Sequence, residues 1–183
     1  VTWARGFGTL RTGNVVDVKA DDGTVTSYRP RHVILATGSV PVELPFLKFD
    51  EERVVSNVGA LKLHEVPRRL IVIGGGIIGL ELGSVWRRLG AQVTVIEFMP
   101  TILPGSDDDI IKEAARVFKK QGMEIHTGTK VTGGRREGEQ VIVEVEENGA
   151  SATYTADCVL VSVGRKPALF GVDAAALGLT VGA

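Results

Sequence analysis

An apolar run leads directly into a cluster of glycines at residues 72–81, which read VIGGGIIGLE. Gly74, Gly76 and Gly79 have the spacing G-x-G-x-x-G. In this pattern the first glycine allows a tight turn, the second lets a phosphate approach the backbone, and the third lets a helix pack closely on a strand. The helix N-terminus then offers N–H groups and a positive dipole end to an anion. The stretch therefore predicts a strand-turn-helix unit that holds a nucleotide pyrophosphate.

The flanking sequence fits a β-α-β unit. An apolar strand is predicted at 70–74, a helix at 77–89 with Gly90 as its C-terminal cap, and a second strand at 92–97 that ends in Glu97. A carboxylate at that strand end accepts hydrogen bonds from the adenosine ribose and repels a 2′-phosphate, which favours NAD(H) over NADP(H). The alternative is a surface glutamate in an unrelated α/β domain. Glu81 either faces the cleft or is a solvated helix residue, and its spacing favours neither.

The remaining elements predict an α/β fold with a Rossmann-like parallel sheet and an antiparallel β-meander. Asn148-Gly149 is a strong hairpin signal within the meander. A further helix should begin near Ser106 with three Asp residues in its first positions. The predicted strands are 14–20, 24–28, 32–36 (buried), 123–127, 129–136, 139–147, 151–156 and 158–164, and the other predicted helices are 56–63, 107–121 and one turn at 173–177.

Composition excludes several classes of function. The net charge of the 183 residues is −1, so nothing suggests nucleic-acid binding, and no apolar run approaches the roughly 18–20 residues of a membrane span. Cys158 is the only cysteine, so no internal disulfide can form, and its apolar surroundings predict a buried structural thiol. No metal site is expected. The chain begins at Val1 without a Met, and we expect it to be a piece of a longer protein.

Five stretches form a recognisable set: GFG at 6–8, ILATGS at 34–39, GGGIIGLELGSVWRRLGAQVTVIE at 74–97, KQGMEIHTGTKVTG at 120–133 and VGRKP at 163–167. Together they resemble the central part of the pyridine nucleotide–disulfide oxidoreductases. The stretch ELGSVWRRLGA is the most specific and is most similar to the members that oxidise dihydrolipoamide.

The resemblance implies a domain plan and a role for individual residues. Residues 1–45 would be the β-rich end of an FAD-binding domain, 46–165 the NAD-binding domain, and 166–183 a segment returning toward the FAD and interface domains. Glu97 would bind the adenosine ribose, Val131 would line the adenine side, and Gly164 would lie near the nicotinamide. The pyrophosphate loop and first helical turns would be Gly74, Gly75, Gly76, Ile77, Ile78, Gly79, Leu80 and Glu81, and the residues approaching FAD would be Thr37, Gly38 and Ser39.

The resemblance also implies what this chain does not contain. The family's CxxxxC redox pair, its N-terminal FAD fingerprint and its C-terminal catalytic His have no counterpart here, so we expect no catalytic residue in this chain. His32, His64 and His126 are expected to be structural or surface residues. The implied partners of the full-length protein are NAD(H), the lipoyl domains of 2-oxoacid dehydrogenase complexes and a second copy of itself, in the bacterial cytoplasm or the mitochondrial matrix. The alternatives are another NADH-linked flavoprotein disulfide reductase, a free-standing NAD-binding module, or a scaffold for protein partners.

Overall fold

The computed structural model describes residues 1–182 of the chain, which divide into two compact units. One unit contains residues 1–40 and the segment from residue 165 onward, and the other contains residues 41–164. The assignment of the chain to FAD-binding, NAD-binding and return segments stays a prediction.

The centre of the 41–164 unit is a five-stranded sheet in the order β5-β12-β6-β7-β8. All four pairs of neighbouring strands are parallel. Strands that are buried on both faces have continuous apolar sequences, and the segments at 70–74 and 158–161 have such sequences. The strands are β5 (Val54–Val55), β12 (Cys158–Val161), β6 (Arg69–Ile73), β7 (Gln92–Ile96) and β8 (Glu124–His126).

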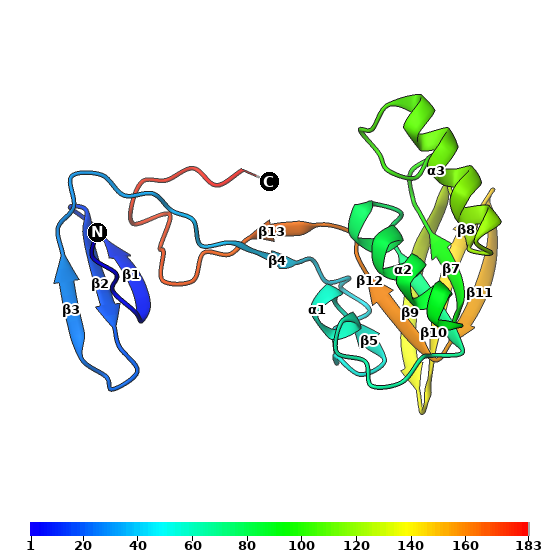
Figure 1. Cartoon of the computed structure of the whole chain (residues 1–183), viewed down its shortest axis with the longest axis horizontal. Coiled ribbons are helices and arrows are strands. Elements are labelled where there is room, and N and C mark those ends of the chain that lie inside the picture. The colour runs from blue at the N-terminus through cyan, green and yellow to red at the C-terminus, as the bar shows by residue number, and fades with distance from the viewer. Residues whose placement is uncertain (183) are drawn as a thin grey trace. The chain divides into compact units, whose positions relative to one another are not determined.

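The helices and the antiparallel meander of this unit cover the sheet as two layers (Figure 1). Alternate side chains of the strands pack with the one layer or the other. Leu70 and Val72 of β6 pack with the helices, whereas Ile71 and Ile73 pack with the meander. The helices are α1 (Asn57–Ala60), α2 (Ile77–Leu89) and α3 (Asp108–Lys120), and the meander strands are β9 (Thr129–Glu137), β10 (Gln140–Glu147) and β11 (Ala150–Ala156) in the order β11-β10-β9. The predicted α/β class, with a parallel sheet and an antiparallel meander, is confirmed.

Local signals explain where the helices begin and end. α2 has the predicted limits and ends at Gly90, whose φ of 115° is left-handed and suits glycine. Ser56 caps α1 by accepting from the amides of Val58 and Gly59, but α1 ends at Ala60 rather than at residue 63. The N-cap of α3 is Asp107 rather than Ser106, and its carboxylate accepts from the amide of Asp109.

The other unit contains two small sheets. The antiparallel sheet β1-β2-β3 is built from β1 (Phe7–Arg11), β2 (Val15–Lys19) and β3 (Val25–Tyr28), and Gly23 turns between the last two with a φ of 86°. β4 (Ser39–Pro41) pairs with β13 (Arg165–Pro167). The predicted turn at 173–177 is present, with the Leu177 amide donating to the Asp173 carbonyl at 3.1 Å.

The prediction of a buried strand at 32–36 is wrong. No strand is assigned there, and Ile34 is 91% exposed. A strand forms only when its backbone N–H and C=O groups pair with a neighbouring strand. Among the described residues this segment has no such neighbour, although its apolar composition is typical of a buried strand.

Strand β12 lies between β5 and β6, and all four of its residues are buried in the two-sided core. We expect Leu160→Ala to lower the free energy of unfolding by about 2–4 kcal/mol, because Leu160 is fully buried and its truncation leaves a cavity. Urea denaturation followed by circular dichroism measures this. Leu61→Ala is the matched control, since Leu61 is 73% exposed and should change stability little. Equal effects of the two substitutions would contradict the proposed core.

Candidate dinucleotide-binding site

A groove of about 570 Å³ opens at the carboxyl ends of β6, β7 and β12. Ligands of open α/β sheets bind at this edge, beyond the ends of the strands. The groove is lined by Leu44, Ile73, Gly74, Gly76, Ile96, Glu97, Phe98, Met99, Pro104, Thr129, Lys130, Val131, Ser162, Val163 and Gly164.

Two of the three motif glycines are fixed by close packing. Gly74 has a φ of 108°, and a Cβ there would lie 2.5 Å from the carbonyl oxygen of Ser162. A Cβ on Gly79 would lie 2.2 Å from the carbonyl oxygen of Gly74. Any side chain at Gly79 would therefore push α2 away from the end of β6, which is the close helix–strand contact that the motif predicts.

Gly76 differs from both because a Cβ there would meet no atom within 4 Å. Gly76 is the N-cap of α2, and no side chain caps this end of the helix. The first N–H groups of a helix have no intrahelical acceptor, and the helix dipole places positive charge there. Open space in front of an uncapped helix N-terminus fits a bound pyrophosphate.

Glu97 lies directly after β7 and is 7% exposed. Its Oε2 accepts from the amide of Gly75 at 2.6 Å, and its Oε1 accepts from the amide of Met99 at 2.6 Å. Its own amide donates to the carbonyl of His126, and its carbonyl accepts from the amide of Thr129. The carboxylate therefore joins the glycine turn to the segment that follows β7.

The groove brings together some of the residues predicted for NAD and leaves others apart. Those that line it are Gly74, Gly76, Glu97, Val131 and Gly164. The remaining residues of the predicted loop belong to the turn or to α2 and do not line it. Gly75, Gly79 and Leu80 are buried, Ile78 is half-buried, and Ile77 and Glu81 are exposed.

Sequence reasoning missed several residues that line the groove. Ser162 is the most informative, because its hydroxyl donates to the carbonyls of Ile73 at 3.0 Å and Gly74 at 3.2 Å. It follows β12 directly, so the rule that sites form beyond the carboxyl ends of parallel strands would have pointed to it. Met99 and Pro104 follow β7 in the loop before α3, and no local pattern marks them.

Thr37, Gly38 and Ser39, the residues predicted for FAD, are exposed and belong to the other unit. Arg165 holds Ser39 through two donated bonds, from Nε to Oγ at 2.7 Å and from its terminal nitrogen to the carbonyl at 2.6 Å. Gly38 has a φ of 83°, and a Cβ there would meet nothing within 4 Å. The assignment of these three residues to FAD stays a prediction.

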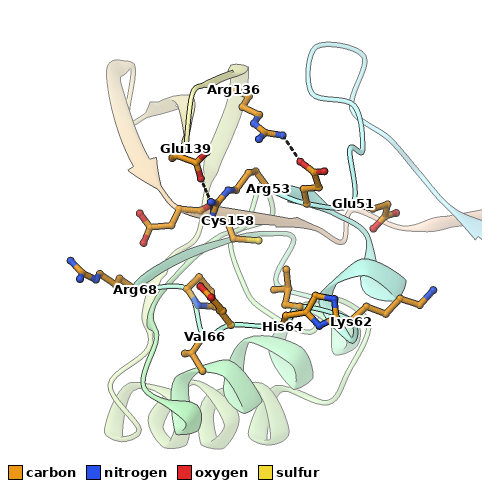
Figure 2. Close-up of a pocket in the computed structure, with 14 residues that line it drawn as sticks. Glu51, Arg53, Lys62, His64, Val66, Arg68, Arg136, Glu139 and Cys158 are labelled. Carbon is orange, nitrogen blue, oxygen red and sulfur yellow. Dashed lines mark hydrogen bonds and ion pairs between the residues drawn. The ribbon is translucent and has the colours of Figure 1, made fainter.

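A larger hollow, of about 1030 Å³, lies at the opposite, amino-terminal edge of the sheet (Figure 2). Two of its acidic side chains form ion pairs: Glu139 with Arg53, and Glu52 with Arg136 at 3.0 Å. Cys158 borders this hollow but is 2% exposed, and burial raises its pKa to about 12. A protonated, buried thiol is not a nucleophile, which agrees with the predicted structural role.

The remaining candidates for a site are the three histidines and the side chains that could bind a metal ion. His32 and His64 are exposed, whereas His126 packs edge-on against Tyr154 with ring centroids 5.3 Å apart. The Nε2 atom of His126 lies 2.9 Å from a carboxylate oxygen of Glu124. Within residues 1–182 no group of three or more His, Cys, Asp or Glu side chains is arranged to hold a metal ion. No helix in that range is long and apolar enough to cross a membrane.

The glycine geometry predicts that two similar substitutions differ in their effect. We expect Gly79→Ala to lower the free energy of unfolding by about 1–3 kcal/mol, because the new methyl group overlaps the Gly74 carbonyl. Gly76→Ala is the matched control and should cost less, at most about 1 kcal/mol, because its methyl group meets no atom and only the N-cap preference for glycine over alanine is lost. Urea titration of both variants tests this, and a Gly79→Ala variant as stable as Gly76→Ala would contradict the close contact.

Comparison with curated proteins gives relatives over nearly the whole chain. The sequence is 43% identical over 181 residues to dihydrolipoyl dehydrogenase 3 of Pseudomonas putida, covering 98% of this chain and 39% of the relative. It is 44% identical over 183 residues to the mitochondrial dihydrolipoyl dehydrogenase of Dictyostelium discoideum, covering 98% of this chain and 38% of that protein. The chain thus spans about two-fifths of the length of the curated relatives it matches.

Solved structures with the same fold include LpdA of Mycobacterium tuberculosis, with 26% identity and a TM-score of 0.85. Another is the HOCl-induced flavoprotein disulfide reductase RclA of Escherichia coli, with 26% identity and a TM-score of 0.77. Each match covers 97% of this chain and 39% of the solved chain. Residues 5–183 also match the sequence profile of one family. The chain belongs to the pyridine nucleotide-disulphide oxidoreductase family.

Proposed function

We propose that the groove at the carboxyl edge of the sheet binds NAD(H). The observation that carries this proposal is the uncapped N-terminus of α2, which begins at Gly76 with open space in front of it. A buried carboxylate, Glu97, forms part of the same groove. Together they offer an anion site and an acceptor group at the two positions that the phosphates and the adenosine ribose of a dinucleotide require.

Each predicted residue has a distinct role in this proposal. The segment from Gly74 to Glu81 holds the pyrophosphate through backbone amides and the helix dipole. Glu97 accepts from the adenosine ribose, Val131 lines the adenine side, and Gly164 lies near the nicotinamide. The negative charge of Glu97 disfavours a 2′-phosphate and hence NADP(H). Lys130 also lines the groove, but Glu146 is its cross-strand partner in the meander, so an acidic side chain opposes its charge.

The whole protein is proposed to be a dihydrolipoyl dehydrogenase, which converts dihydrolipoamide and NAD⁺ to lipoamide, NADH and a proton. Support comes from the 43–44% identity to proteins of that name across nearly all of this chain. FAD, when bound, supplies the two-electron step between the dithiol substrate and NAD⁺, and Thr37, Gly38 and Ser39 would lie beside it. The proposed partners are lipoyl domains of 2-oxoacid dehydrogenase complexes and a second copy of the protein, in the bacterial cytoplasm or the mitochondrial matrix.

Another flavoprotein disulfide reductase is the competing assignment. The structural likeness to RclA, at 26% identity, favours this wider class. Both assignments require the same NAD(H) groove, so they differ in the disulfide substrate and not in the site described for this chain. A free-standing NAD-binding module would also bind NAD(H), but it would transfer no electrons between a flavin, thiols and the nucleotide.

The central test is calorimetric titration of the chain with NAD⁺. We expect Gly76→Val to reduce affinity at least tenfold, because its side chain occupies the space through which the pyrophosphate approaches the helix N-terminus. Gly8→Val is the matched control, since a side chain on Gly8 also meets nothing within 4 Å but lies in β1 of the other unit. Undiminished NAD⁺ binding by Gly76→Val would refute the site.

A second test concerns catalysis by the chain alone. With added FAD and NAD⁺, we expect these 183 residues to form no NADH from dihydrolipoamide. The reaction of the family needs a pair of reactive thiols, and the single Cys158 is buried and protonated. NADH absorbance during incubation measures the rate, with an active dihydrolipoyl dehydrogenase as the positive control. NADH formation proportional to the concentration of this chain would show that the expectation is wrong.

A further inference from the structure

The carboxylate of Glu97 is already engaged by the protein before any ligand binds. Both of its oxygens accept backbone N–H groups, from Gly75 on one side and Met99 on the other, each at 2.6 Å. Gly75 is buried, and no other acceptor is recorded for its amide within the described residues. Hydrogen bonds to an ionised acceptor are stronger than neutral ones, and losing the acceptor would leave a buried donor unsatisfied.

The Gly75 residue is also held from its other side. Its carbonyl oxygen accepts from the amide of Leu103 at 2.9 Å. A trans peptide points its N–H opposite to its C=O, so this bond fixes the direction of the next N–H, that of Gly76 at the start of α2. Leu103 belongs to the loop whose first residues Glu97 ties down through Met99. The carboxylate therefore fixes the turn directly and fixes the loop that holds the turn.

Packing around Gly75 leaves this arrangement little freedom. A Cβ on Gly75 would lie 3.1 Å from the Cβ of Glu97 and 3.2 Å from a methyl group of Ile102. The stem of Glu97 thus lies against the turn, with Ile102 buried beside it at 2% exposure. No longer side chain fits at Gly75 without moving either neighbour.

We propose that Glu97 is a positioning residue for the phosphate-binding turn as well as an acceptor for the ribose. It aligns the amides of the turn at the N-terminus of α2, so its removal weakens binding of the pyrophosphate even when the ligand has no ribose hydroxyl for it to contact. This inference rests on the proposed NAD(H) site. Removing Glu97 therefore does not convert the site to NADP(H) binding. The 2′-phosphate would no longer be repelled, but the turn would hold the pyrophosphate less well.

Hydrogen exchange of the free chain, followed residue by residue by NMR, tests the hold on the turn. In the wild-type chain we expect the Gly75 amide to exchange at least tenfold more slowly than the Gly76 amide. Glu97→Ala should speed Gly75 exchange by roughly ten- to hundredfold, since a charge-assisted bond to a buried donor is lost. Glu97→Gln keeps one acceptor oxygen and should restore part of the protection. Glu113→Gln, an equal loss of charge on the exposed face of α3, is the matched control and should leave Gly75 unchanged.

The ligand arm uses 2′,3′-dideoxyadenosine diphosphate, which carries the pyrophosphate but no ribose hydroxyl for Glu97 to contact. We expect Glu97→Ala to weaken its binding about tenfold, and NADP⁺ binding not to improve. Affinities come from NMR shift titrations of the wild-type chain, Glu97→Ala and Glu113→Gln. Equal affinity of wild type and Glu97→Ala for the dideoxy ligand would overturn the proposal and leave Glu97 with the ribose alone.

The two arms separate this proposal from the site itself. Equal Gly75 exchange in wild type and both Glu97 variants overturns the positioning role, whatever binds. Failure of the wild-type chain to bind NAD⁺ contradicts the proposed function instead, and the exchange rates of the free chain still decide whether Glu97 holds the turn. If Glu97→Ala does not fold, the test uses the slow Gly75 exchange in the wild-type chain and its acceleration in Glu97→Gln. Fast Gly75 exchange in the wild-type chain would then overturn the positioning role.

Discussion

The close contact between Gly79 and the Gly74 carbonyl is the constraint on which the site depends. It lets α2 begin directly beyond the end of β6, with its first amides at the carboxyl edge of the sheet. Ser162, which follows β12, stabilises the same turn because its hydroxyl donates to the carbonyls of Ile73 and Gly74. Two neighbouring strands and one helix therefore meet at a single turn, and the groove is the space left in front of it.

Electrostatics and packing act together at this turn. Glu97 is a buried carboxylate without a cationic partner within residues 1–182, and burying such a group would be costly if it were not hydrogen-bonded. Two backbone amides compensate its charge, and the nearby helix N-terminus is electropositive. One acidic side chain thus connects the turn to the segment after β7 through two backbone amides.

The sequence predicted elements whose signals are local. The limits of α2 followed from its apolar spacing and from Gly90, and the meander followed from alternation and Asn148-Gly149, which both take positive φ. The prediction of a buried strand at 32–36 was wrong because an apolar run indicates burial but does not supply a neighbouring strand for pairing. In the groove, Gly74, Gly76 and Glu97 were predictable from the motif. No local pattern marks Met99. Ser162 is marked only by its place directly after β12, because its hydroxyl bonds reach Ile73 and Gly74, which are far away in the sequence.

The candidate groove and the thiol of Cys158 lie at opposite edges of the sheet. The dinucleotide groove is made by residues 41–164 and lies at the carboxyl edge of the sheet, whereas Cys158 borders the hollow at the amino edge. Burial raises the pKa of this thiol to about 12, so it stays protonated and is a poor nucleophile. The groove and the hollow share no lining residue, so substitutions in the groove leave the surroundings of this thiol unchanged.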